Sequence, residues 1–148
     1  MPRAIPPAAL TLIKRFEGRS LQAYRCPAGK LTIGYGHTGP DVCDGQTILP
    51  DVAETLLLQD AGRVGIAIEK AVTVPLTDNE FAALICFTFN VGVGNFLRSS
   101  LLIILNQGCY EFVPLQLVRW NRAGGEVMGG LSRRRAAEVA LWNKKTEA

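Results

Sequence analysis

Three side chains near the start of the sequence have types and spacing suited to chemistry: the carboxyl of Glu17, the thiol of Cys26 and the hydroxyl of Thr32. A carboxyl can transfer a proton, a thiolate can act as a nucleophile, and a hydroxyl can help to hold a water molecule. The chain between them is short enough for all three to face one cleft. Each residue also has an ordinary alternative, as a surface acid at a helix end, an isolated thiol and a strand threonine.

The segment before Glu17 predicts a helix that carries this residue in its last turn. Apolar residues recur at helical spacing up to Phe16, and a Pro-Pro pair suits the first turn, so we predict an amphipathic helix over residues 7–17. Gly18 can end this helix in a left-handed conformation. Because the helix dipole disfavours an anion at the C-terminus, Glu17 should hold its proton more readily there.

The next segment changes to the period of a β-strand. Leu31, Ile33 and Tyr35 alternate with small or polar residues, which predicts a strand with one face toward a core. A proline and a glycine in residues 27–30 predict the turn that leads into this strand. We therefore expect a glycine-rich segment with strands from about residue 24 to residue 46.

The remainder of the chain predicts helices. Pro50 opens a long helix that continues to about residue 72, with Gly62 and Gly65 as weak points. Its predicted apolar face consists of Val52, Leu56, Val64, Ala67, Ile68 and Ala71. The segment from Thr77 to Glu80 has the spacing of a capping box. Further helices are predicted over residues 77–90, 95–107, 110–120 and 132–144, with a loop between the glycine pairs at 124–125 and 129–130.

These elements predict an α+β fold that forms a single domain over residues 1–148. A small lobe with one helix and a short sheet occupies about residues 1–50. A connecting helix follows over about 50–72, and a helical lobe over about 73–148. A cleft between two such lobes is a natural place for an extended ligand.

The composition is that of a globular protein and disfavours several function classes. Of the 148 residues, 48% are hydrophobic and 20% are charged, and the formal net charge is +3. This charge is too small for a nucleic-acid-binding stripe but suits a polymer that carries carboxylates. No apolar run reaches the roughly 20 residues that span a bilayer, and residues 1–7 lack the features of a secretory signal. We expect no nucleic-acid partner and no stable membrane insertion.

The four cysteines show no C-x-x-C spacing, so we expect no metal site and no cofactor. Cys86 lies in an apolar run and is predicted to be a small buried residue. A disulfide between Cys26 and Cys43 would make the site sensitive to reduction, but only geometry can decide whether it forms.

Motifs along nearly the whole chain resemble those of the phage-type lysozymes, or endolysins, in the same order. Phe16-Glu17-Gly18, then Cys26, then residues 31–38 (LTIGYGHT) are similar to the family signature. In that signature an aspartate or cysteine follows the glutamate by nine positions, and a threonine follows by six more, as in this sequence. The second half resembles the family at residues 87–92, 98–101, 119–125 and 130–135.

The resemblance implies a lysozyme-like fold and an endolysin activity. Such a muramidase hydrolyses the β-1,4 bonds between N-acetylmuramic acid and N-acetylglucosamine in bacterial peptidoglycan, which causes host cell lysis. Glu17 would donate a proton to the leaving oxygen. The family also implies a cation near Glu17, supplied by Arg133, Arg134 or Arg135. This charge would lower the pKa of the glutamate, in opposition to burial and to the helix end.

Cys26 stands where many family members have an aspartate. A thiol has a reference pKa of about 8.5, so little thiolate is present near neutral pH unless neighbours such as Arg25 and Lys30 favour it. The thiolate could stabilise positive charge on the sugar, activate water together with Thr32, or attack directly. We favour water activation, because the resemblance assigns Thr32 to placing the water.

The resemblance places further residues along the cleft. The expected substrate-binding residues are Tyr35, Thr38, Phe89, Asn90 and Ser100. Phe89 is equally consistent with a core position on its helix. His37 is expected to brace the sheet rather than to act as a general base. Trp120 and Trp142 are expected to pack in the core.

Other functions stay open at this stage. A lytic transglycosylase also uses a single glutamate but closes an anhydro ring without water, and a wall-binding module would have no activity. A redox or metal-binding domain is disfavoured by the unpatterned cysteines. A phage lysozyme would be a monomer made in the host cytoplasm, with the glycan strands of peptidoglycan as its substrate. It would reach the wall through a membrane lesion made by a holin.

Overall fold

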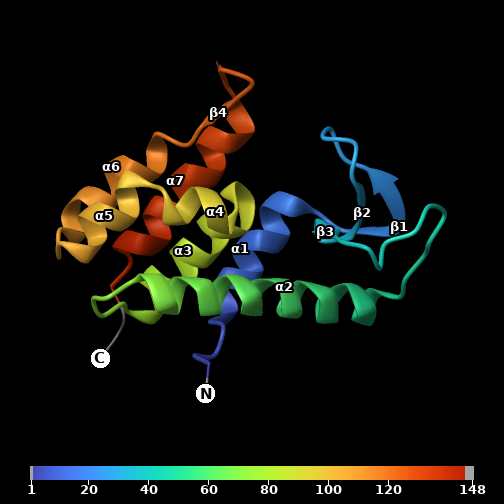
Figure 1. Cartoon of the computed structure of the whole chain (residues 1–148), viewed down its shortest axis with the longest axis horizontal. Coiled ribbons are helices and arrows are strands. Elements are labelled where there is room, and N and C mark those ends of the chain that lie inside the picture. The colour runs from blue at the N-terminus through green and yellow to red at the C-terminus, as the bar shows by residue number, and fades with distance from the viewer. Residues whose placement is uncertain (1, 146–148) are drawn as a thin grey trace.

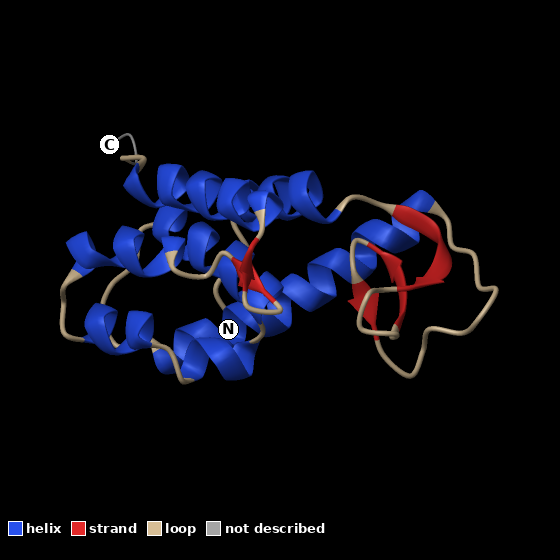
Figure 2. Ribbon diagram, turned by 90° about the horizontal axis from the view of Figure 1, so that it is seen from above, coloured by secondary structure: helices blue, strands red, loops and turns tan. Residues whose placement is uncertain are grey.

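The computed structural model describes residues 2–145, and in this part of the chain most helices gather at one end and a small sheet lies at the other. The long helix α2 (Pro50–Ala71) runs beneath both parts in Figure 1. Figure 2, seen from above, shows the sheet separated from the group of helices along the long axis. The predicted α+β class and the connecting helix are both confirmed.

Helix α1 (Pro7–Glu17) packs in the helical lobe, although it precedes the sheet in the sequence. Its residues Ala9 and Ile13 are fully buried in the same core as helix α3 (Asp78–Val91), and Figure 1 shows α1 beside α3. The predicted small lobe over residues 1–50 was therefore too large, because it included this helix. The amphipathic pattern identified the buried face of α1 but carried no information about which lobe covers it.

The small lobe is a three-stranded antiparallel sheet in the order β1 (Ser20–Arg25), β2 (Leu31–Gly34) and β3 (His37–Thr38). Thr32 of β2 pairs with Tyr24 on one side and with Thr38 on the other. Strand β1 begins before the predicted start near residue 24. Its register shifts between Ser20 and Tyr24, so the strand lacks the regular alternation on which the prediction depended.

Helix α2 has the predicted length, and its predicted apolar face is confirmed in part: Ile68 is fully buried, and Val64 and Ala71 pack against the core. Its buried residues form a stripe three or four positions apart, Ala53, Leu57, Ala61, Gly65 and Ile68. Val52, which was predicted to face the core, is exposed. A Cβ at Gly65 would lie 2.8 Å from Cδ1 of Ile5, so the absent side chain lets the N-terminal segment pack closely on the helix. Small residues give little hydrophobic signal, which is why the burial of Ala53, Ala61 and Gly65 was not predicted.

Helix α3 runs through the centre of the helical lobe. Its capping box is confirmed: Glu80 N–H donates to the Thr77 hydroxyl at 3.1 Å, and Thr77 N–H donates to the Glu80 carboxylate at 2.8 Å. Every residue from Phe81 to Thr88 is buried, as expected for a helix covered on all sides. Within residues 2–145, neither this helix nor any other is long and apolar enough to cross a bilayer.

The helix predicted over residues 95–107 is two short helices, α4 (Val93–Leu97) and α5 (Ser100–Asn106). Ser99 causes the break, because its hydroxyl donates to the Phe96 carbonyl at 2.6 Å and accepts from Leu102 N–H at 3.2 Å. The next predicted helix is likewise shorter, with a 3₁₀ turn η1 (Tyr110–Phe112) before α6 (Val113–Val118).

The predicted loop near residue 124 is a hairpin of β4 (Arg122–Ala123) and β5 (Glu126–Val127). Gly124 and Gly125 both have positive φ, which a tight hairpin turn requires and glycine adopts without strain. Helix α7 (Gly129–Asn143) then begins three residues earlier than predicted and includes the second glycine pair. The hairpin and the first turn of α7 thus come directly before the arginines of α7.

Candidate active site

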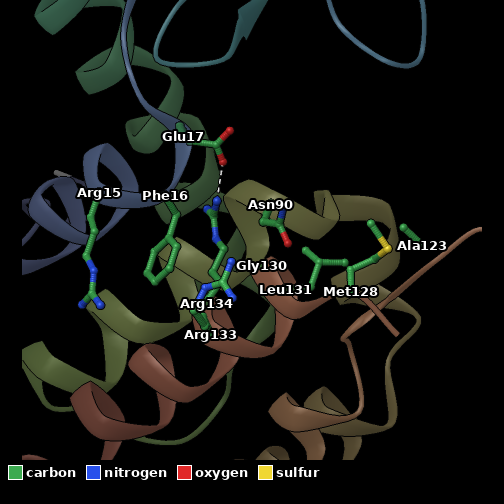
Figure 3. A pocket seen from close by; sticks show the side chains of 10 residues that line it. All are labelled: Arg15, Phe16, Glu17, Asn90, Ala123, Met128, Gly130, Leu131, Arg133 and Arg134. Atoms are coloured by element: carbon green, nitrogen blue, oxygen red, sulfur yellow. Dashed lines mark hydrogen bonds and ion pairs between the residues drawn. The ribbon is translucent and has the colours of Figure 1, made fainter. Parts of the chain in front are cut away.

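Glu17 is the last residue of α1, at the junction between the lobes. Gly18 ends the helix with a φ of 68°, and its N–H donates to the Lys14 carbonyl. The side chain of Glu17 is 22% exposed, so its carboxyl reaches solvent from a mostly covered position. Figure 3 shows this carboxyl above the guanidinium of Arg134.

Arg134 is the cation that the family resemblance predicted without choosing among three arginines. Its Nη1 atom donates to Oε2 of Glu17, and its Nη2 donates to the carbonyl of Cys86 at 3.0 Å. Its neighbours cannot share this position, because consecutive helix residues point about 100° apart. Arg133 is exposed, and Arg135 is buried among the helices.

A second acid, which the sequence motifs did not single out, lies behind Arg134. Glu138 is fully buried. Its Oε2 accepts from Nη2 of Arg135 at 2.9 Å and lies 3.5 Å from Nε of Arg134. Burial raises the pKa of Glu138, while the guanidiniums of Arg135 and Arg134 oppose this shift. The spacing of three and four residues from the two arginines was the available signal.

Gly36 brings the backbone of the small lobe against the carboxyl of Glu17. Its φ is +80°, and a Cβ at this position would lie 3.0 Å from Oε1 of Glu17. A glycine therefore fits both the local conformation and the close approach. The family motif contains this glycine, but the motif alone does not say what it contacts.

Cys26 begins the turn between β1 and β2, where backbone N–H groups surround its partly exposed sulfur. A hydrogen bond from the Lys30 backbone lowers the pKa of this thiol, and although burial raises it, smaller contributions from the Ala28 backbone and the Thr32 hydroxyl lower it further, so the pKa is lowered overall. The expectation that cationic side chains favour the thiolate was only partly right. Lys30 acts through its N–H group, and the guanidinium of Arg25 donates to the Gly29 carbonyl at 2.9 Å.

Thr32 is buried on β2 beside this turn. Its hydroxyl donates to the Lys30 carbonyl at 3.0 Å and also lies within hydrogen-bond reach of the Cys26 thiol. A hydroxyl has a single hydrogen, so the Thr32 hydroxyl that donates to the Lys30 carbonyl can accept from the Cys26 thiol but must rotate to donate to a thiolate. The turn thus joins Cys26 and Thr32 through short contacts, as the sequence spacing suggested.

Two cavities open near Glu17. A cavity of about 670 Å³ is lined by the end of α1, the end of α3, the hairpin and the first turns of α7, and Figure 3 shows its lining residues around Glu17 and Arg134. A cavity of about 370 Å³ is lined by the sheet, α2, α3 and α4, and it includes Gly36. Because Gly36 adjoins Glu17, the carboxyl lies where the two cavities approach each other.

Three of the five predicted substrate-binding residues line these cavities. Asn90 lines the larger one, whereas Thr38 and Phe89 line the smaller one. Tyr35 does not point into either cavity: it is 8% exposed, and its hydroxyl donates to Oε1 of Glu54 at 3.2 Å, so this prediction is not supported. Ser100 is exposed at the start of α5 and does not line either of the two.

His37 braces the sheet, as predicted. Its Nδ1 atom lies 2.8 Å from Oδ2 of Asp60 on α2, and its Nε2 lies 3.0 Å from Oδ2 of Asp41. Burial lowers the pKa of His37, but the two carboxylates outweigh this effect, so the pKa is raised. With both ring nitrogens engaged, the imidazole holds β3 against α2.

The four cysteines of the chain are unpaired thiols in the structure, so Cys26 and Cys43 are not bonded to each other. Cys86 is fully buried, as predicted, and burial raises the pKa of its thiol. Trp120 packs edge-on against Phe87 with a centroid distance of 5.7 Å, in agreement with its predicted packing role.

Comparison with protein families matches this geometry to a known group. The family model described as phage lysozyme matches residues 14–138, a range that contains Glu17, the Cys26 turn and Arg134. The chain therefore belongs to the phage lysozyme family.

Curated relatives from phages have related names. The endolysin of Bacillus phage PZA is 45% identical over 144 residues, which cover 96% of this chain and 56% of that protein. The endolysin of Acyrthosiphon pisum secondary endosymbiont phage 1 is 40% identical, with 90% of this chain and 93% of that protein covered. The SAR-endolysin of Escherichia phage Mu is 41% identical, with 86% and 74% covered. The chain spans about half the length of the Bacillus phage endolysins that it matches.

Solved structures have the same fold. The muramidase domain of SpmX from Asticaccaulis excentricus superposes with a TM-score of 0.89 at 35% identity, covering 97% of this chain and all of that one. A point mutant of P22 lysozyme superposes with a TM-score of 0.86 at 36% identity, covering 96% and 99%. These similarities extend over both lobes and the helix that joins them.

Proposed function

We propose that this chain is a muramidase that hydrolyses the β-1,4 bonds between N-acetylmuramic acid and N-acetylglucosamine in bacterial peptidoglycan. The observation that carries the proposal is the Glu17 carboxyl, held by Arg134 and the Gly36 backbone between two cavities. Membership of the phage lysozyme family and the endolysin names of the relatives support it.

In the proposed mechanism Glu17 donates its proton to the glycosidic oxygen, so the bond to the leaving sugar breaks without release of an alkoxide. The charge of Arg134 then stabilises the carboxylate that remains. Arg134 is itself fixed by the Cys86 carbonyl, which limits the positions available to the Glu17 carboxyl. The glutamate is thus oriented toward one place in the cleft.

Cys26 and Thr32 supply the second half of the reaction. The Cys26 thiolate accepts a proton from a water molecule, and the Thr32 hydroxyl helps to place this water for attack on the anomeric carbon. The lowered pKa of Cys26 increases the fraction of thiolate that can act as this base. The proton gained by the thiol and the proton lost by Glu17 are then exchanged with solvent, which restores both groups.

The biological setting follows from the same proposal. The protein would be made in the phage host cytoplasm as a monomer, reach the cell wall after a holin permeabilises the membrane, and lyse the host. Its net charge of +3 suits a carboxylate-bearing wall polymer. The family and the endolysin relatives support this course of events.

Glu17→Gln tests the proposal on purified peptidoglycan. The amide keeps the shape of the side chain but cannot donate an acidic proton, so we expect activity to fall by about 100-fold or more. Glu111→Gln, an exposed glutamate on η1, is the matched control and should keep wild-type activity. Full activity of the Glu17 variant would contradict the proposal.

Mass spectrometry of the released muropeptides identifies the reaction. Hydrolysis gives reducing ends, because water adds to the anomeric carbon. Anhydro ends from the wild-type chain would instead show a lytic transglycosylase, and no soluble product would indicate a wall-binding module.

A further inference from the structure

The core of the helical lobe contains buried charged side chains that do not contact the proton donor Glu17. Two guanidiniums, those of Arg134 and Arg135, lie with the Glu138 carboxylate in a region where each residue is at most 3% exposed. Buried charges are costly unless they are paired and hydrogen-bonded. The three side chains therefore form a unit, and only one of them contacts Glu17.

The contacts show how this unit fixes Arg134. Its guanidinium has a partner on three sides: Nη1 meets Glu17, Nη2 donates to the Cys86 carbonyl, and Nε lies 3.5 Å from Oε2 of Glu138. The same Glu138 oxygen accepts from Nη2 of Arg135, and the Nε of Arg135 lies 2.6 Å from the other oxygen in an ion pair. Glu138 is thus the anion that both arginines share.

Arg135 has further contacts that hold it away from the cleft. Its Nη1 donates to the Trp120 carbonyl at 3.3 Å, and its guanidinium lies 4.9 Å from the centroid of the Phe87 ring. Removal of the Glu138 charge would leave Arg135 in place as an unbalanced cation behind Arg134.

The negative charge of Glu138 matters because the side chains near Glu17 are mainly positive. The cavity beside Glu17 is lined by three cations, Arg15 of α1 and Arg133 and Arg134 of α7, and α3 contributes the neutral Asn90. The small lobe contributes the backbone at Gly36. Among these described neighbours there is no second acid, so no anion other than Glu17 lies beside these positive charges. Glu138, behind Arg134, is the anion that offsets this positive charge.

We propose that Glu138 is a positioning residue for the proton donor. Its buried carboxylate fixes the guanidinium of Arg134 on Glu17 and balances the charge of Arg135, so that Glu17 can still hold a proton. This inference rests on the proposed function of Glu17 as the acid. It gives Glu138 an effect on the proton affinity of Glu17 in addition to its role in packing.

Glu138→Gln removes this charge with little change in shape. The charge of Arg135 is then unbalanced, so we expect the pKa of Glu17 to fall by about one unit. The carboxyl carbon of Glu17, followed by NMR in ¹³C-labelled protein and assigned with Glu17→Gln, reports this pKa directly. At neutral pH a fall of one unit leaves about tenfold less protonated acid, so kcat should fall about tenfold while KM changes little.

Two further variants separate charge from packing. Arg135→Gln removes the opposite charge and should raise the pKa of Glu17. The double variant Arg135→Gln/Glu138→Gln restores the charge balance and should return this pKa to within a few tenths of the wild-type value, although its packing is changed most. If Glu138→Gln does not fold alone, comparison of the double variant with Arg135→Gln measures the same Glu138 charge.

The results that would overturn the positioning role of Glu138 differ from those that would overturn the proposed function. An unchanged Glu17 pKa in folded Glu138→Gln, or a pKa in the double variant as low as in Glu138→Gln, would overturn the positioning role. Full hydrolytic activity of Glu17→Gln would overturn the proposed function instead. Glu138→Asp, which keeps the charge, should retain more of the wild-type pKa than the glutamine variant.

Discussion

The two faces of the site are built in different ways. On the helical face, Arg134 and Glu138 are buried between packed helices and joined by several charged contacts. On the sheet face, Cys26 is partly exposed on a turn and is held by backbone hydrogen bonds, with a neighbouring hydroxyl as its partner. The first face depends on the core of the protein, whereas the second depends on the local shape of one short loop.

This difference predicts how substitutions on each face affect the stability and the activity of the protein. A substitution on the helical face leaves a buried charge without its partner, so it should cost stability as well as activity. A substitution on the sheet face removes a reactive group from a site close to solvent, so activity should fall with little effect on folding. The difference also fits the family signature, in which aspartate and cysteine share the position of Cys26 while the glutamate is constant.

Arg134→Met gives the largest expected effect on the helical face. The change leaves Glu17 and Glu138 without their shared cation, so we expect a loss of about 3–5 kcal/mol in the free energy of unfolding, measured by urea denaturation. Arg133→Met, the exposed neighbour, should change this free energy by less than about 0.5 kcal/mol. Equal losses in the two variants would remove the distinction between the faces.

Cys26→Ala tests the sheet face. We expect a loss of about 100-fold in activity because the base for the water is removed, with the urea midpoint almost unchanged. Cys26→Asp supplies a carboxylate in its place and should keep substantial activity, and Cys43→Ala, an exposed cysteine, should behave as the wild type. An active alanine variant would exclude Cys26 from the mechanism.

Gly36→Ala tests the point where the two faces meet. A positive φ costs an alanine about 1–2 kcal/mol, and its Cβ would press on Oε1 of Glu17, so both stability and activity should fall. Gly45→Ala is a matched control, because Gly45 has a φ of +77° but no atom within 4 Å of the added Cβ. The control should lose similar stability and keep its activity. Equal activities would show that contact with Glu17 is unimportant.

The smallest expected effect is the pH dependence that His37 gives to the sheet. The imidazolium can donate to both Asp41 and Asp60, whereas the neutral ring has one N–H for two carboxylates. The pKa of His37 is raised in the folded state. Its contribution to stability is therefore complete below the unfolded pKa of about 6.5 and is lost as the pH rises through the folded pKa.

His37→Gln provides the comparison for this effect. The difference in free energy of unfolding between wild type and variant, from urea titrations at several pH values, should decrease as the pH rises above about 6.5. A difference that is constant with pH would show that the ring acts only as a neutral brace.

The sequence predicted the parts of the fold that depend on local signals. The capping box at Thr77 and the proline at the start of α2 place helix ends correctly, because these residues act on neighbouring backbone. The buried face of α2 was predicted only in part, because alanine and glycine form much of it. The assignment of α1 to the wrong lobe has a different cause. The spacing of apolar residues in one helix shows which face is buried but not which distant segment covers it.

The candidate active site, like the fold, was predictable from the sequence only in part. The spacing of Glu17, Cys26 and Thr32 identified the candidate residues, and the family motif predicted an arginine beside the acid. Selection of Arg134 required the orientation of α7, and the role of Glu138 required knowledge of what is buried behind it. Tyr35 was misjudged because it lies in the turn between β2 and β3, where its side chain is directed toward α2 and Glu54.

The packing of α1 in the helical lobe has a consequence for the order in which the chain becomes active. The acid and its arginine are 117 positions apart in the sequence. During synthesis α1 is translated long before its partner helix α7. The acid–arginine pair therefore cannot form in the nascent chain until α7 has been translated.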